Sequence, residues 1–220
     1  MEHIERNYQL IKKRMIEQLE NSIKLGRKLI DTELDTGFLN FIIKPIVKAF
    51  YDYWSHNDAR DGTLKQINIT LEAGKNLLLN GSSDEIFNEI LDNSFPKYLE
   101  ADQTTRQCSR THKNYEKLKN VIKETFINYL KEVVKLLDIK DEVDNYGDLC
   151  REAFPSKEVA KQNLMKQLDF TDRSIKIVEE DPNILKLPVG KKIILKALRK
   201  GFEHTREEFT KALNDTYNNK

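Results

Sequence analysis

The residues best suited to bind a metal ion are Cys108 and His112, which lie four positions apart. On a helix this spacing puts both side chains on one face, where they could share a zinc ion. Such a site needs two more ligands, and the remaining cysteine and histidines show no paired spacing: Cys150, His3, His56 and His204. We therefore interpret Cys108 as a buried thiol and His112 as a core or rim histidine. We predict no metal site here and no other cofactor.

A second candidate for chemistry is the pair Asp58 and Asp61, which follows His56 in the polar stretch 55–62. This Asp-x-x-Asp spacing resembles the magnesium-binding carboxylates of all-helical prenyl diphosphate enzymes, and the resemblance would imply a magnesium-dependent phosphate-ester enzyme. That chemistry needs a second acidic face across a cavity. The comparable pair at Asp141 and Asp144 lies at a predicted helix start, where the helix dipole already favours acidic residues. We therefore expect Asp58 and Asp61 to cap and turn a loop.

Motifs of covalent or phosphate-transfer catalysis are missing from the sequence. The Gly190-Lys-Lys segment has no upstream glycine at phosphate-loop spacing and no serine or threonine after it. There is also no His-Glu-x-x-His and no Gly-x-Ser-x-Gly segment. The sequence therefore favours a non-enzymatic role.

Two basic helix faces could bind phosphate groups of nucleic acid or of an anionic membrane. The first face consists of Arg106, Arg110, Lys113 and Lys117. The second face consists of Lys192, Lys196, Arg199 and Lys200. No aromatic residues are interleaved with either stripe to stack on bases, so solvated helix faces are the simpler interpretation. Basic and acidic residues nearly balance, 37 against 36, and therefore give no global field that attracts polyanions.

The element that must position these side chains is the apolar stretch Phe38–Trp54. At about 100° per residue its apolar side chains cover about half of a helical wheel, which predicts a helix buried on several sides. Pro45 inside the run predicts a kink or a helix start. An apolar ligand beside this helix would contact its aromatic side chains: Phe41, Phe50, Tyr53 and Trp54. The alternative is that these aromatic residues only fill the core.

Helical periodicity continues along the rest of the chain, with no credible strand. We predict an all-α, single-domain bundle of about eight helices over residues 1–220, wrapped around the helix at 38–54, with a possible C-terminal helical hairpin at 156–220. Serine or threonine followed three residues later by glutamine or glutamate predicts helix starts at Thr63 and Ser82, and Pro96 should end the helix that Ser82 opens. The predicted helices are 4–30, 38–54, 63–80, 82–95, 104–137, 143–154, 156–179 and 188–217.

Composition and the N-terminal residues give the remaining expectations. The two cysteines are too few for a disulfide framework, and the charged N-terminus lacks an apolar signal core, so we expect a cytoplasmic protein. Lys44 and Lys48 argue against a membrane span at 38–54. We predict a non-enzymatic binding protein for a protein partner or an apolar small molecule, with a homo-oligomer possible. The alternatives are a peripheral membrane or nucleic-acid binder and the magnesium enzyme.

Overall fold

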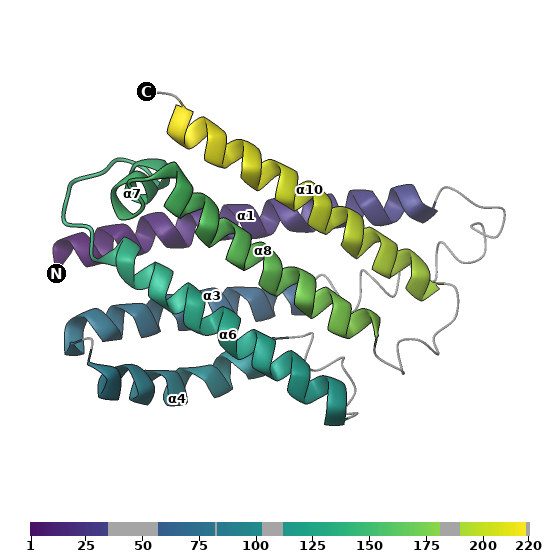
Figure 1. Ribbon diagram of the computed structural model, residues 1–220, viewed down its shortest axis with the longest axis horizontal. Helices are drawn as coiled ribbons and strands as arrows, with labels where there is room; N and C mark the ends of the chain where they lie inside the picture. The colour runs from purple at the N-terminus through teal and green to yellow at the C-terminus, as the bar shows by residue number, and fades with distance from the viewer. Residues whose placement is uncertain (35–56, 82, 103–111, 181–189, 219–220) are drawn as a thin grey trace.

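The computed structural model describes residues 1–34, 57–81, 83–102, 112–180 and 190–218. These residues form seven helices and no strand, which confirms the predicted all-α class for the described part of the chain. The helices pack into a bundle (Figure 1). They are α1 (Glu2–Leu34), α3 (Asn57–Asn80), α4 (Asp84–Ala101), α6 (His112–Leu137), α7 (Tyr146–Ala153), α8 (Lys157–Glu179) and α10 (Gly190–Asn218).

The apolar core has two clusters, and both draw side chains from α3 and α6. The ring of Phe126 is fully buried in the second cluster, with its centroid 4.5 Å from Tyr98 and 6.1 Å from Phe95. Helices α3 and α6 therefore lie at the centre of the described core. The predicted central helix at 38–54 lies outside the described residues. The first cluster contains Ile4, Tyr8, Ile11, Ile67, Leu71, Val133, Leu136, Leu137, Leu149 and Phe154, and the second contains Ala73, Leu77, Leu91, Phe95, Tyr98, Leu118, Ile122, Phe126 and Leu130.

Helix α1 follows the predicted apolar seam, with Ile4, Tyr8 and Ile11 buried. A polar residue, Asn7, sits on the same face and is fully buried. Its amide nitrogen Nδ2 lies 3.2 Å from the carbonyl oxygens of Leu136 and Leu137 and 2.7 Å from that of Ile139. Because the last carbonyls of a helix have no intrahelical donor, Asn7 closes the C-terminal end of α6 from a neighbouring helix.

The predicted loop at 55–62 is wrong, because α3 begins at Asn57. Thr63 is therefore inside the helix and caps nothing. The first turns of α3 gain support from α1, since Arg60 Nε donates to Glu20 Oε1 at 2.8 Å. Asp58 and Asp61 likewise lie within α3 and do not cap or turn a loop.

Two details predicted for α4 are also wrong. The N-cap is Ser83, whose Oγ accepts a hydrogen bond from the Ile86 amide at 3.3 Å. Pro96 lies inside the helix, which continues to Ala101. A proline inside a helix costs about 3 kcal/mol, but α4 continues because Phe95 and Tyr98, on either side of Pro96, are both buried against α6.

Helices α8 and α10 pack against each other and cover the remainder of the bundle, α8 against α6 and α10 against α1 (Figure 1). Helix α8 begins directly after Ser156, as predicted. Helix α7 meets the end of α10, where Arg151 Nη1 donates to the Thr216 carbonyl at 3.3 Å. No helix among the described residues has the length and apolarity needed to cross a membrane.

Candidate interaction surface

Several of the residues predicted to form sites lie outside the described part of the chain. The aromatic set is Phe41, Phe50, Tyr53 and Trp54, and Cys108, Arg106 and Arg110 also fall in undescribed segments. The side chains of Asp58, Lys113 and Lys192 likewise lie outside the description. The geometry below concerns the remaining predicted residues and the surface around them.

Asp61 is exposed in the first turns of α3. Its closest described ionic contact is with its neighbour, Arg60 Nη1, at 3.8 Å. Among the described residues, no three histidine, cysteine or acidic side chains come together as a metal site. The described geometry therefore gives no support to magnesium chemistry at Asp61.

Arg199 forms an ion-pair network between α10 and α8. Its Nε donates to Glu179 Oε1 at 2.7 Å, and its Nη1 donates to Asp172 Oδ1 at 2.5 Å. Hydrogen bonds to Glu179 and Asp172 raise the pKa of the Arg199 guanidinium above its ordinary value. Lys176 Nζ, 2.6 Å from Asp172, and Arg199 lower the pKa of the Asp172 carboxyl. Arg199 therefore joins two helices through carboxylates of its own chain.

The other described members of the basic faces are lysines. Lys117 is exposed on α6, and Lys196 and Lys200 are exposed on α10. Of the described cations in these faces, Arg199 already has two carboxylate partners, Glu179 and Asp172, in its own chain.

Cys150 is half-buried on α7 beside Tyr146. Burial raises the pKa of its thiol to about 11, although a hydrogen bond with Tyr146 lowers it somewhat. Because the thiolate is the nucleophilic form of cysteine, this thiol is poorly reactive near neutral pH.

The outward face of α8 combines apolar side chains with charges of both signs around a shallow hollow. Met165 is 48% exposed and lines this hollow. Val159 is 43% exposed, but it lies six residues before Met165 and so points about 120° away from it. Phe170 carries the Arg173 guanidinium 4.9 Å above its ring. The hollow is lined by Glu158, Lys161, Gln162, Met165, Lys166, Asp169 and Phe170.

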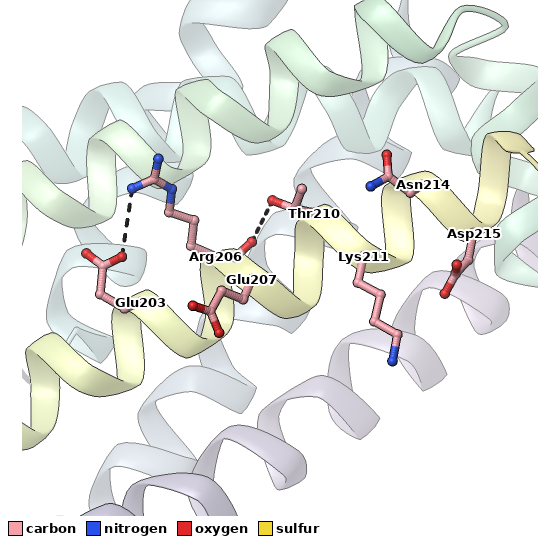
Figure 2. A pocket seen from close by; sticks show the side chains of 7 residues that line it. All are labelled: Glu203, Arg206, Glu207, Thr210, Lys211, Asn214 and Asp215. Atoms are coloured by element: carbon pink, nitrogen blue, oxygen red, sulfur yellow. Dashed lines mark hydrogen bonds and ion pairs between the residues drawn. The ribbon is translucent and has the colours of Figure 1, made fainter.

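The outward face of α10, in contrast, is polar (Figure 2). Arg206 extends from α10 toward α8 and lies 3.8 Å from Glu203, whereas Lys211 extends to the opposite side of the helix. Acidic and basic side chains alternate along this face, so it has no strong field of either sign. Its lining residues are Glu203, Arg206, Glu207, Thr210, Lys211, Asn214 and Asp215.

The exposed apolar residues of α8, Met165 and Val159, were not among the site residues predicted from the sequence. Elsewhere on this helix Leu168 is buried and Leu164 is half-buried. Two features of the sequence could have indicated the exposure of Met165 and Val159. Val159 lies five residues before Leu164, off the three-to-four spacing of one helix face, and Met165 follows Leu164 directly and so points about 100° away from it.

Comparison with protein-family models, curated proteins and solved structures finds no match to this chain.

Proposed function

We propose that the protein is a non-enzymatic interaction protein that binds a protein partner through the outward face of α8. The observation that carries this proposal is the exposure of Met165 in the hollow that Phe170 and charged side chains also line. Apolar side chains within a polar, charged rim are the usual composition of a protein-binding surface, with methionine enriched at its centre. A flexible methionine also adapts its shape to a partner.

The charges around Met165 favour a protein partner over a polyanion. Lys161 and Lys166 lie between Glu158 and Asp169 along the same helix face, which therefore carries two charges of each sign. Nucleic acid and anionic membranes require an excess of positive charge. This face would suit a partner that presents an apolar side chain flanked by charges of both signs. Pairing of those charges across the interface would set the orientation of the partner.

Site-specific photo-crosslinking tests the proposal. A photoreactive benzoylphenylalanine replaces Met165 in one variant and Leu79 in the matched control, because both side chains are 48% exposed. In cells, we expect one discrete crosslinked protein from position 165 and no such product from position 79. Excess wild-type protein should compete with this product, and excess Met165→Glu protein should not.

Two results would contradict the proposal: diffuse or missing products at position 165, or the same products from both positions. A product of twice the mass of the chain would identify the partner as a second copy. Binding to anionic vesicles that weakens steeply with salt would favour the basic-face alternative. A saturable change in Trp54 fluorescence with a fatty acid, persisting at high salt, would favour the apolar-ligand alternative.

A further inference from the structure

Helices α8 and α10 differ from the rest of the bundle in how they are attached to it. Among the described side chains, α6 provides eight of the buried apolar residues, α8 provides Leu168 alone and α10 provides none. Eight further apolar residues of the pair that the structure describes are only half-buried: Leu164, Phe170, Ile175, Ile177, Phe202, Phe209, Leu213 and Tyr217.

The contact between α8 and α6 contains a row of polar side chains. Glu124 and Glu132 of α6 both bond to α8: Arg173 Nη2 lies 2.8 Å from Glu124 Oε2, and Asn163 Nδ2 donates to Glu132 Oε2 at 3.0 Å. Asn128 lies midway between these glutamates, four residues from each, and so on the same side of α6. Its buried Nδ2 has no hydrogen-bond partner among the described residues.

This row stabilises the attachment of α8 weakly. An ion pair as exposed as Arg173 and Glu124 contributes little net stability. Burial raises the pKa of the Glu132 carboxyl, so its charged form is disfavoured at this contact. The unpaired amide of Asn128 costs free energy that separation from α8 would recover through hydration.

The two helices are joined to each other by stronger charged contacts than those that join α8 to α6. Arg199 of α10 bonds to both Asp172 and Glu179 of α8, and all three side chains are about two-thirds or more covered. Networks of several charges hold more firmly than isolated exposed pairs. The pair therefore has internal ties that separation from the bundle leaves intact.

We propose that α8 and α10 open from the bundle as one cooperative unit while α1, α3, α4 and α6 stay folded, so that the pair acts as a displaceable cover. Opening would expose the inward side of α8 around Leu168 and the sides of α6 and α1 that the pair covers. The inference does not depend on partner binding at the outward face of α8.

Native-state hydrogen exchange on the full chain tests this inference with two matched substitutions. Leu168→Ala removes the one buried leucine of α8, and Leu130→Ala removes a fully buried leucine of α6. Undocked helices lose their amide protection because isolated helices are marginally stable in water. We expect Leu168→Ala to speed the exchange of the amides of α8 and α10 together, by about 30-fold or more, and to speed the slowest amides of α3 and α6 as well, because the contacts of Leu168 are lost in the partly open and in the fully unfolded state. Leu130→Ala should speed only the slowest amides of α3 and α6 and leave those of α8 and α10 unchanged, because Leu130 stays packed when the pair opens.

Equal acceleration of all helices by Leu130→Ala would overturn the proposal, because it would show one cooperative unit. Acceleration of α8 without α10 by Leu168→Ala would also overturn it. Should Leu168→Ala fail to fold, Arg173→Gln serves with Arg60→Gln as its control, since both arginines pair with a glutamate of another helix at 2.8 Å. We then expect about two- to fivefold faster exchange in α8 and α10 for Arg173→Gln only. No difference between the two variants would overturn the inference.

Discussion

Asn7 provides the sharpest test of how the bundle is held together. Its side chain is fully buried, and its Nδ2 faces the carbonyl oxygens of Leu136, Leu137 and Ile139. Alanine at this position removes about two net hydrogen bonds, each worth about 1 kcal/mol, and leaves buried carbonyls without a donor. Including that penalty, we expect Asn7→Ala to lower the free energy of unfolding by about 3 kcal/mol. For a chain of this size the melting temperature should fall by about 6–12 °C.

Asn7→Asp separates hydrogen bonding from shape, because aspartate has the same size but at neutral pH offers only acceptors. A buried carboxylate facing carbonyl oxygens is repelled, so this variant should be less stable than Asn7→Ala at pH 7. Burial raises the pKa of that carboxyl in the folded state above its unfolded value. The folded state therefore binds more protons, and the deficit should shrink as the pH falls through the folded pKa.

Thermal unfolding followed by circular dichroism between pH 4 and 8 measures these effects. Asn68→Asp is the matched control, because Asn68 is exposed on α3, and it should shift the melting temperature by about 1 °C or less. If Asn7→Asp melts like Asn68→Asp, the amide of Asn7 does not close the end of α6 and the reasoning fails.

Three further predictions follow from the same contacts. Glu132→Gln keeps an acceptor for Asn163 but removes a carboxyl whose pKa is raised by burial. It should therefore raise the melting temperature at pH 7. This gain should shrink as the pH falls toward the pKa that the Glu132 carboxyl has in the unfolded chain. Gly74→Ala should destabilise the fold by about 1 kcal/mol despite its better helix propensity, because its Cβ would lie 2.8 Å from Val133 Cγ1. Adding Val133→Ala should relieve that clash, so the double variant should lose less stability than the sum of the two single variants. Additive effects in the double-mutant cycle would refute the clash as the cause. The melting temperatures of the parent chain and of the double variant Asp58→Asn/Asp61→Asn should both be nearly independent of added magnesium. A magnesium-dependent shift of several degrees in the parent that the double variant lacks would restore the enzyme hypothesis.

The helical class was predictable because it rests on local periodicity. The seam of Ile4, Tyr8 and Ile11 repeats at three- and four-residue steps, and in the structure these residues are buried. Ser156 also marks the start of α8 correctly. Helix propensity and apolar spacing depend on near neighbours in the chain, and so they can be read without the fold.

Tertiary contacts decided where local signals competed. Pro96 should end a helix, but burial of Phe95 and Tyr98 against α6 carries α4 past it. The polar residues before Thr63 indicate a loop, but α3 already begins at Asn57, where Arg60 contacts Glu20 of α1. In both cases contacts between helices distant in sequence outweigh a local preference.

The proposed interaction surface likewise depended on the fold. The sequence alone established an all-helical chain with balanced charge and no recognisable catalytic motif. Which side of α8 faces solvent was decided by the packing of α6 and α10 around it, and this packing leaves Met165 and Val159 exposed. The engagement of Arg199 by Asp172 and Glu179 was decided in the same way, because it requires α8 and α10 to lie side by side. Periodicity indicates that a helix has an apolar side, but the neighbours that cover that side are fixed only by tertiary structure.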